Sequence, residues 1–521
     1  RGLEIRLALN SMNTPLPPLP VAKIRTKGDP NMSKMAKGAL MRGHFIGGQW
    51  VPGQSSFPDL NPADGSVWAF AAEGGSSEAL RAIEAAREAF PAWSALPHTE
   101  RARALLKAAR VWDSRRDDFV SAMQNEGGGT FGKGMFEHTY VSEVLRAAAA
   151  VTYQALGEIL PSEYGKLSLA VRSPVGVVVT LSPWNFPAIL AARQFANPLA
   201  IGNTIVLKPS EETPYCGGLF IAEVMAEAGL PPGVFNVITC SRHKVTEVGD
   251  ELIENSNVKG VTFTGSSAIG RAIAAKCGAH LKKCCIELGG NDAMIVLEDA
   301  DLDRAAQGAN FGSFMLHGQI CMSVERVLVQ ETVFEDFLSR FKARAMKLSI
   351  GDPRDRANMI GPMINQKQAD RVRHHISDAV NKGARIELGG GGTGTYVEPT
   401  ILTGCTSDML VMQEETFGPV VPVIPFRDDA EAIRLSNDTE YGLSSGIFSG
   451  NEERALRMAR RLETGMCHIN CSSVNDEPHV PFGGTKSSGM GRNGGRWSVD
   501  TFSDTRWITV ERGGRHFPPM F

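Results

Sequence analysis

A cysteine and a glutamate in separate glycine-containing turns have the residue types that covalent catalysis needs. Cys321 follows Gly318 and precedes Ser323, and Glu287 precedes the pair Gly289–Gly290. A thiolate attacks carbon centres readily, and a carboxylate can activate the water that later releases the product. We therefore predict that Cys321 is a nucleophile and Glu287 a general base. The alternatives are an inert buried thiol and a surface acid at the end of a strand.

Three polar segments have the features of a dinucleotide site, because each follows an apolar run typical of a strand. They are Ser182–Pro187, Lys208–Glu211 and Phe263–Ser266. The last leads into a predicted helix, whose first N–H groups could face a phosphate. None of the three is the usual G-x-G-x-x-G motif, and Lys208 alone would most often be a surface lysine. Their repetition at successive strand ends favours a bound dinucleotide.

These residues are positioned by an alternating α/β pattern between Gly176 and Leu297. Such alternation predicts a parallel sheet with helices on both faces. The predicted strands are Val177–Leu181, Ile205–Leu207, Val234–Ile238, Val258–Phe263 and Ala293–Leu297. The predicted helices are Pro187–Ala200, Pro214–Ala228, Lys244–Asn255 and Ser267–Cys277.

A second α/β series follows, and the glycines of Leu288–Asn291 are the natural hinge between the two. Its predicted strands are Val324–Val329, Val420–Pro425 and His468–Asn470. Its predicted helices are Thr332–Leu348, Asn365–Asn381 and Glu452–Thr464. Two further helices, Ser77–Phe90 and Thr99–Ser121, should form an N-terminal layer.

Three segments lie outside both series. Leu156–Arg172 and Arg506–Arg512 alternate apolar and polar residues like exposed strands, which usually pair with another strand. Residues 1–40 contain four prolines between Pro15 and Pro20 and few acids, so we expect a disordered extension or an expression remnant. A transit peptide is the alternative.

The composition limits the possible partners. The 521 residues carry 54 Lys+Arg and 57 Asp+Glu, a net charge of −3, so we expect no nucleic-acid or membrane-surface partner. No apolar run reaches the roughly 18 residues of a membrane span. The nine cysteines have no zinc-like spacing, which predicts reduced thiols in the cytoplasm and no metal.

Together with Asn185 and Glu415, these segments resemble the aldehyde dehydrogenase superfamily from about Phe45 to Trp507. The resemblance implies an α/β fold of three parts. A Rossmann-like NAD-binding domain would comprise residues 41–155 and 173–288, and a second α/β domain, residues 289–500, would be catalytic. Residues 156–172 and 501–521 would form a small β arm and tail that join subunits into a homodimer or homotetramer.

The resemblance also implies how NAD is held. Lys208 and Glu211 would bind the adenosine ribose, and Trp184 and Ser266 would face the pyrophosphate. The other cofactor-binding residues would be Ser210, Phe263, Gly265, Glu415 and Phe417. The Glu211 carboxylate would repel a 2′-phosphate, so NAD should be preferred over NADP. Lys208 could still tolerate the phosphate, and Arg242, in a loop that departs from the family pattern, could favour it.

The implied reaction is oxidation of an aldehyde to a carboxylic acid. Cys321 would form a thiohemiacetal whose oxyanion is held by the Asn185 amide and the Cys321 backbone N–H. Hydride transfer to NAD would leave a thioester, which a water activated by Glu287 would hydrolyse.

The substrate is expected to be an aromatic aldehyde such as benzaldehyde, vanillin or salicylaldehyde. Segments such as Asn475–Pro478 and Thr505–Thr509 resemble the branch that oxidises these compounds. Arg193 could stack on a ring or bind a phenolic oxygen, or it could form only a structural salt bridge. The predicted substrate pocket contains Phe186, Ile189, Arg193, Ile320, Met322 and Phe482.

Three alternatives compete with this interpretation. A CoA-acylating enzyme would lack the base, so Glu287 argues against it. An aliphatic aldehyde or semialdehyde dehydrogenase is the main rival. A non-enzymatic structural protein on this fold would be expected to have lost Cys321, Glu287 or Asn185, and all three are present.

Overall fold

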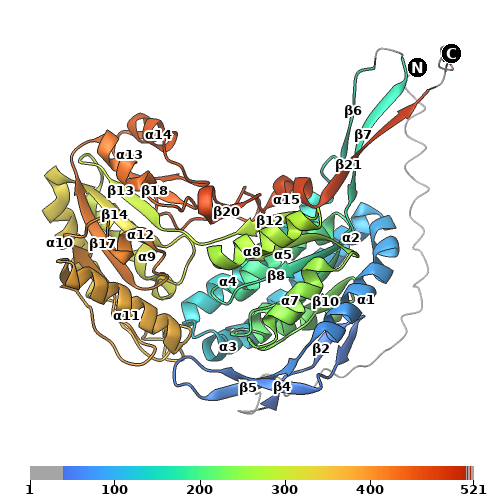
Figure 1. Ribbon diagram of the computed structural model, residues 1–521, viewed down its shortest axis with the longest axis horizontal. Helices are drawn as coiled ribbons and strands as arrows, with labels where there is room; N and C mark the ends of the chain where they lie inside the picture. Colours follow the sequence, from blue (N-terminus) through green and yellow to red (C-terminus); the bar gives the residue numbers. More distant parts are fainter. Residues whose placement is uncertain (1–38, 163–164, 512, 514–516, 518–521) are drawn as a thin grey trace, which may run out of the picture. The chain divides into compact units, whose positions relative to one another are not determined.

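The computed structural model describes residues 39–162, 165–511, 513 and 517 (Figure 1). The predicted extension therefore lies almost wholly outside the described residues. Its last two residues contradict the prediction, because β1 (Ala39–Leu40) pairs in parallel with β5 (Val67–Glu73). With β4 (Ser55–Leu60), these strands form a three-stranded sheet that was not predicted.

The first large sheet has eight strands and contains four of the five strands predicted between Gly176 and Leu297. In order, these are β20 (Gly489–Met490), β12 (Lys283–Glu287), β11 (Val258–Thr264), β8 (Val177–Leu181), β9 (Thr204–Lys208), β10 (Phe235–Val237), β2 (His44–Ile46) and β3 (Gln49–Val51). The five strands from β12 to β10 run parallel. Strands β8 and β9 are buried along their whole length, as expected of apolar runs covered on both faces.

Helices cover both faces of this sheet. One face packs against α1 (Ser76–Ala95), α7 (Val245–Glu254) and α8 (Ser267–Ala279). The other face packs against α5 (Pro187–Ala200) and α6 (Phe220–Glu227). A π-helical turn, Tyr215–Leu219, leads directly into α6. The helix predicted over Thr99–Ser121 is wrong in detail, because α2 (His98–Ser114) and α3 (Arg116–Glu126) meet at Arg115. The unpredicted α4 (Phe131–Val151) packs on α5.

The second large sheet has seven strands. In order, these are β15 (Arg385–Leu388), β16 (Thr400–Thr403), β17 (Val420–Phe426), β14 (Val324–Gln330), β13 (Asp292–Val296), β18 (Ser445–Phe448) and β19 (His468–Ile469). Helices α9 (Leu302–Phe314) and α10 (Phe334–Ala345) cover one face. The other is covered by α11 (Gln366–Asn381), α13 (Asp429–Asn437) and α14 (Glu452–Ala459), so the last helix is shorter than predicted.

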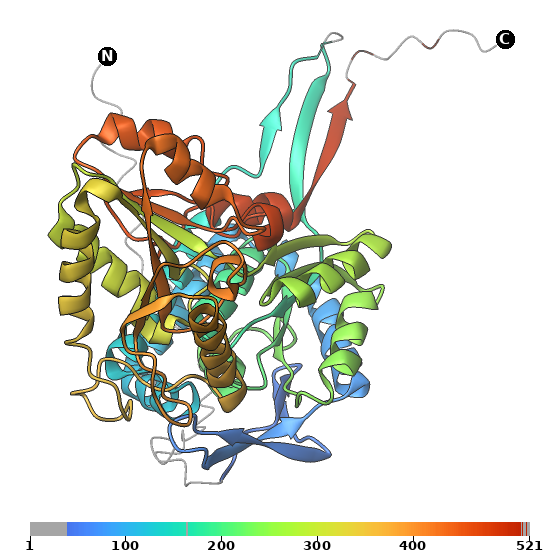
Figure 2. The same ribbon diagram turned by 60° about the vertical axis from the view of Figure 1, so that its left-hand side comes forward.

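The predicted arm and tail form one small antiparallel sheet of β6 (Gly157–Ile159), β7 (Leu167–Pro174) and β21 (Ser503–Val510). Strand β7 pairs with all eight residues of β21, from Ser503 opposite Pro174 to Val510 opposite Leu167. The three strands lie side by side in both ribbon views (Figures 1 and 2). The pairing expected of two exposed edges is thus confirmed, and their role in subunit assembly remains a prediction.

The hinge Leu288–Asn291 lies between β12 of the first large sheet and β13 of the second, so the strand predicted at Ala293–Leu297 belongs to the second sheet. The chain returns later, because β20 pairs with β12 and α15 (Gly495–Thr501) packs on α5. The domain boundaries predicted from the sequence remain a prediction. None of the helices in the described residues is long and apolar enough to cross a membrane.

Candidate active site

The polar segments predicted to converge do meet at one sheet edge, because the strand register aligns their ends. Leu181 at the end of β8 lies opposite Lys208 of β9 and opposite Phe263 of β11. Thr264 of β11 lies opposite Glu287, the last residue of β12. The carboxyl ends of these parallel strands therefore carry the segments containing Asn185, Lys208, Ser266 and Glu287 along one edge, where ligands of such sheets bind.

A strained turn presents Cys321. Leu316, His317 and Gly318 have φ of +49°, +57° and +68°, and a Cβ added at Gly318 would lie 2.2 Å from the Gly418 carbonyl oxygen. The turn is held from outside, since Gln319 Oε1 accepts a hydrogen bond from the Ile364 backbone N–H at 2.9 Å. Left-handed backbone at non-glycine residues costs energy and is found most often at functional sites.

Asn185 connects the first sheet to this turn. Its Nδ2 donates to the Gln319 carbonyl oxygen at 3.0 Å, and its side chain is buried. Asn185 comes from the loop after β8, whereas Gln319 lies two residues before Cys321. Because an amide nitrogen carries two hydrogens, the second can be donated to an oxygen at the carbon that Cys321 attacks.

Glu287 is a buried acid and not the surface acid of the alternative interpretation. It is 1% exposed, and its Oε1 accepts a hydrogen bond from Asn493 Nδ2 at 2.8 Å. Burial raises the pKa of Glu287 to about 7, opposed by the charge of Arg193. A carboxyl group with this pKa can both accept and release a proton near neutral pH, as a general base must.

The environment of Cys321 disfavours a free thiolate. Burial, followed by the nearby carboxylates of Glu287, Glu415 and Asp292, raises the pKa of the Cys321 thiol above its usual range. The hinge lies against this residue, since a Cβ added at Gly290 would be 2.5 Å from the Cys321 carbonyl oxygen. The thiol therefore needs a neighbouring base, and Glu287 is suited to take its proton.

The first sheet offers groups that match a dinucleotide. Lys208 is buried, with its Nζ donating to the Pro209 carbonyl oxygen at 3.0 Å, so it is not an ordinary surface lysine. Glu211 follows in the same segment with a partly exposed carboxylate. Ser266 is the N-cap residue of α8, and its side chain makes no capping hydrogen bond. A diol-binding carboxylate and a helix N-terminus beside one sheet edge suit a ribose and a phosphate.

The second sheet supplies Glu415 and Phe417 to the same region. Glu415 Oε1 accepts from the Gly290 N–H at 3.0 Å, and the Phe417 ring contacts Trp184 edge-on at 5.4 Å between centroids. Glu325, missed from the sequence, holds this loop because its carboxylate accepts from the Thr416 and Phe417 N–H groups at 2.9 and 2.8 Å. Residues predicted to bind the cofactor thus approach from both sheets.

The loop that departs from the family pattern also reaches this region. Arg242 Nε lies 3.7 Å from Glu211 Oε1, and Arg242 Nη1 lies 4.0 Å from Glu212 Oε1. The guanidinium is largely exposed, whereas both carboxylates are partly buried. A positive charge therefore stands beside the carboxylate expected to select between NAD and NADP.

Arg193 forms the structural salt bridge offered as the alternative interpretation, and its role toward the substrate remains a prediction. It is 4% exposed, forms an ion pair with Asp476 Oδ2, and donates to the Tyr140 hydroxyl at 3.2 Å. The Tyr140 hydroxyl donates in turn to Asp476 Oδ2 at 2.5 Å. The guanidinium also stacks 3.9 Å from the centroid of Phe482. The Arg193 charge opposes the rise in the pKa of both Cys321 and Glu287, so the guanidinium lies within electrostatic reach of both groups.

Aromatic rings continue from this cluster toward Asn185. Phe136 contacts Tyr140 at 5.9 Å and Phe186 at 6.3 Å between ring centroids. Phe136 and Tyr140 were missed because α4 was not predicted, although their i, i+4 spacing was a usable signal. The other residues predicted for the substrate pocket are buried, namely Ile189, Ile320 and Met322.

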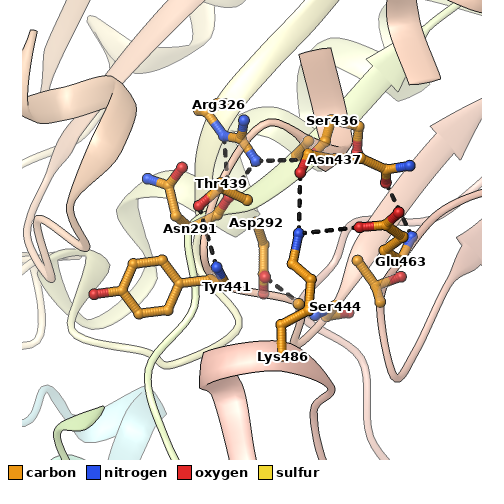
Figure 3. Close-up of a pocket in the computed structure, with 13 residues that line it drawn as sticks. Asn291, Asp292, Arg326, Ser436, Asn437, Thr439, Tyr441, Ser444, Glu463 and Lys486 are labelled. Atoms are coloured by element: carbon orange, nitrogen blue, oxygen red, sulfur yellow. Dashed lines mark hydrogen bonds and ion pairs between the residues drawn. The ribbon is translucent and has the colours of Figure 1, made fainter. Parts of the chain in front are cut away.

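Behind the hinge lies a small polar pocket (Figure 3). Its cations are already engaged. Lys486 Nζ donates to the Asn437 carbonyl oxygen at 3.0 Å, and Arg326 donates to the backbone oxygens of Asn291 and Ser436. The pocket is lined by none of the three predicted catalytic residues. We infer that its hydrogen bonds hold the hinge backbone in place, as the one from Arg326 to Asn291 does.

Known proteins are similar to this chain over most of its length. The model of the aldehyde dehydrogenase family matches residues 50–508. A vanillin dehydrogenase of Pseudomonas fluorescens is 42% identical over 477 residues, covering 91% of this chain and 98% of that protein. A crystal structure of a salicylaldehyde dehydrogenase from Pseudomonas putida G7 complexed with salicylaldehyde is 39% identical, with a TM-score of 0.90 over 93% of this chain and 100% of that one.

A more distant crystal structure carries a cofactor. It is a betaine aldehyde dehydrogenase from Staphylococcus aureus in complex with NAD+, 31% identical with a TM-score of 0.88. It covers 92% of this chain and 96% of that one. The matches extend across both large sheets and the arm strands, as the resemblance in the sequence implied.

Proposed function

This chain belongs to the aldehyde dehydrogenase family, and on that premise we propose that it oxidises uncharged aromatic aldehydes to carboxylic acids with NAD. The observation that supports the substrate class is the Arg193 cluster, in which aromatic rings and a neutralised cation stand beside the reacting groups. The same proposal assigns catalytic roles to Cys321, Glu287 and Asn185.

The first step is addition of the Cys321 sulfur to the aldehyde carbon. Glu287 takes the thiol proton, because its carboxyl group, with a pKa of about 7, is partly ionised at neutral pH, whereas the raised pKa of the Cys321 thiol keeps the thiol protonated. The new C–S bond converts the carbonyl into an oxyanion, which accepts hydrogen bonds from Asn185 Nδ2 and the Cys321 backbone N–H. The product of this step is a thiohemiacetal on Cys321.

The chemistry that NAD supplies when bound is acceptance of the hydride from the thiohemiacetal carbon, which leaves a thioester on Cys321. Glu287 must then release its proton to solvent before it can act again. In the last step its carboxylate removes a proton from water, whose oxygen adds to the thioester carbon. The C–S bond breaks, the carboxylic acid leaves, and the proton held by Glu287 passes to the sulfur, which restores both the Cys321 thiol and the Glu287 carboxylate.

The groups near Glu211 favour NAD without excluding NADP. The Glu211 carboxylate can accept hydrogen bonds from a ribose 2′-OH and would repel a 2′-phosphate. Arg242 at 3.7 Å offsets part of that repulsion, and Lys208 adds a second positive charge. We therefore expect a preference for NAD that is real but incomplete.

The substrate class depends on the charge state of the Arg193 cluster. A semialdehyde carries its own carboxylate and would need an unpaired cation in the site. The only guanidinium of the Arg193 cluster is already paired with Asp476 and also donates to Tyr140. A neutral ring can instead stack on Phe482 or the guanidinium plane. The cluster therefore favours benzaldehyde-like substrates over anionic aliphatic ones.

The experiment that tests the substrate class measures NADH formation with paired aldehydes. Benzaldehyde, salicylaldehyde and vanillin are compared with hexanal and succinic semialdehyde, with Cys321→Ala as the blank. We expect kcat/KM for the ring compounds to exceed that for hexanal and the semialdehyde by at least about tenfold, some 1.4 kcal/mol. If hexanal or succinic semialdehyde is the better substrate, the aromatic assignment is wrong.

One variant sharpens this test. Asp476→Asn removes the carboxylate that neutralises Arg193 while keeping an acceptor for the Tyr140 hydroxyl. It should raise kcat/KM for 4-carboxybenzaldehyde relative to benzaldehyde by about tenfold. Hexanal has no charge and serves as the matched control, so its kcat/KM relative to benzaldehyde should stay within about twofold.

We also propose that the chain assembles into a homodimer or homotetramer through the sheet of β6, β7 and β21. The outer strand β21 exposes the large apolar side chains of Trp507, Ile508 and Val510, and Ile159 on β6 is also exposed. Exposed apolar strand edges favour pairing with another chain.

We further propose that the protein works in a reducing compartment such as the cytoplasm, because all nine cysteines are free thiols.

Truncation tests the assembly. Deleting the chain from Arg506 onward removes the part of β21 that pairs with Leu167–Val171 of β7. We expect the truncated protein to elute from a size-exclusion column as a smaller particle, with its far-UV circular dichroism unchanged. An unchanged elution volume would show that the tail does not join subunits.

A further inference from the structure

We propose that Lys133 and Glu137 of α4 form a buried positioning pair that fixes the start of α5 and thereby the direction of the Asn185 amide. The role of Asn185 as an oxyanion donor rests on the function proposed above. Neither Lys133 nor Glu137 takes part in the chemistry described so far. Both were outside the residues singled out in the sequence.

Glu137 satisfies the first donors of a helix that is not its own. Its side chain is fully buried, and its Oε1 accepts hydrogen bonds from the backbone N–H groups of Ala188 at 2.8 Å and Ile189 at 3.1 Å. These are the second and third residues of α5, and the first is Pro187, which has no N–H. The N-cap residue Phe186 makes no side-chain capping bond, so Glu137 takes over the capping role.

Lys133 completes the pair one helical turn earlier. Its Nζ lies 2.5 Å from Glu137 Oε2, and both side chains are almost entirely buried. The same Nζ lies 5.1 Å from the centroid of the Phe186 ring. The pair therefore contacts the residues on both sides of Pro187, and Phe186 is the direct neighbour of Asn185.

This arrangement makes the direction of Asn185 sensitive to the pair. The Asn185 amide already donates one hydrogen to the Gln319 carbonyl oxygen at 3.0 Å. The direction of its second N–H bond is therefore set by the position of the backbone at Phe186 and Pro187. The Glu137 carboxylate also occupies the N–H groups that would otherwise give α5 a positive N-terminus. Stabilisation of an oxyanion is then left to Asn185 and the Cys321 N–H, and their placement determines the rate.

The competing explanation is that the pair only stabilises the fold. A buried ion pair that loses one partner destabilises a protein wherever it is located. The ion pair of Arg115 and Glu223 is the matched control, because it is also buried, with 2.9 Å between its charged atoms. Arg115 lies between α2 and α3, and Glu223 lies in α6. Within the described residues, the side chain of Glu223 contacts Arg42, Arg115 and Tyr215, none of which belongs to the first turn of α5. Glu223→Gln should therefore lower stability without affecting Asn185.

The test measures the burst of NADH in the first turnover with benzaldehyde and saturating NAD. Glu137→Gln keeps an oxygen for the two N–H groups but leaves Lys133 as an unpaired cation, and we expect the burst rate to fall at least about tenfold. The KM for NAD should change less than about twofold. The neutral double variant Lys133→Met/Glu137→Gln should recover the burst rate to within about threefold of wild type.

The control separates the two explanations. Glu223→Gln should lower the melting temperature about as much as Glu137→Gln and leave the burst rate unchanged. If Glu137→Gln loses stability but keeps the wild-type burst rate, the pair is only a helix cap and the proposal is overturned. If the double variant does not recover the rate, charge pairing is not what positions Asn185. A wild-type protein that forms no NADH from benzaldehyde and NAD would instead refute the proposed function on which this role rests.

Discussion

Replacing Cys321 with alanine is expected to abolish both the burst and the steady-state formation of NADH, a loss on the order of 10⁴-fold or more. The reason is that the thiol sulfur forms the only covalent bond between protein and substrate in the proposed reaction. No neighbouring thiol can substitute, because all nine cysteines are separate free thiols and only Cys321 lies in the strained turn beside Asn185 and Glu287.

A second cysteine provides the control for this substitution. Cys405 is also half-buried, but it packs against the core of the second sheet. Cys405→Ala should keep kcat within about twofold, since a small apolar residue replaces another at a site away from the reaction. Activity that survives in Cys321→Ala but not in Cys405→Ala would mean that the nucleophile has been assigned to the wrong residue.

Replacing Glu287 with glutamine should produce a different kinetic pattern. Steady-state kcat is expected to fall about 10²- to 10⁴-fold, because no carboxylate remains to activate the water that hydrolyses the thioester. The burst of NADH should be slower, since the thiol has lost its proton acceptor, but its amplitude should remain about one per active site. A variant that loses burst amplitude and turnover equally would contradict a separate role in hydrolysis.

The pH dependence of the wild-type enzyme follows from the same carboxyl group. The pKa of Glu287 is raised to about 7 by burial. Below that pH the group is protonated and cannot accept a proton from water, so kcat should rise as the pH increases through about 7. Glu287→Gln should lose this rise. A wild-type profile that is flat between about pH 6 and 8 would indicate that another group is the base.

Much of the cofactor sheet could be predicted from the sequence because its signals are local. Helix α5 was predicted with its observed bounds, since Pro187 is favoured at the first position of a helix and apolar residues follow. The buried strands β8 and β9 are apolar runs that only a covered sheet accommodates. Once these elements alternate, parallel topology places Asn185, Lys208 and Ser266 at one edge.

The unpredicted parts depend on contacts between distant residues. Strand β12 reads Lys-Cys-Cys-Ile-Glu, which neither alternates nor forms an apolar run, so only its place in the sheet identifies it. Asp476 pairs with Arg193 and accepts a hydrogen bond from Tyr140, 336 positions earlier in the chain. Asn493 likewise reaches Glu287 across 206 positions. No local pattern indicates such partners.

The strained turn before Cys321 is another feature that could not be predicted from the sequence. Leu316 and His317 adopt positive φ, which is uncommon for residues other than glycine. Contacts from distant residues, such as the hydrogen bond from the Ile364 N–H to Gln319, hold the turn in place. The sequence indicates that Gly318 permits a turn, but the cost at the two preceding residues becomes visible only in the folded structure.

The most direct test of the central claim, that aldehyde oxidation proceeds through a thioester on Cys321, is to trap that intermediate. Glu287→Gln is mixed with NAD and benzaldehyde, quenched in acid and digested, and the peptide containing Cys321 is analysed by mass spectrometry. We expect a benzoyl group on Cys321 that depends on NAD and is absent from Cys321→Ala. NADH formation with no acyl group on Cys321, or with the group on another cysteine, would contradict the proposed mechanism.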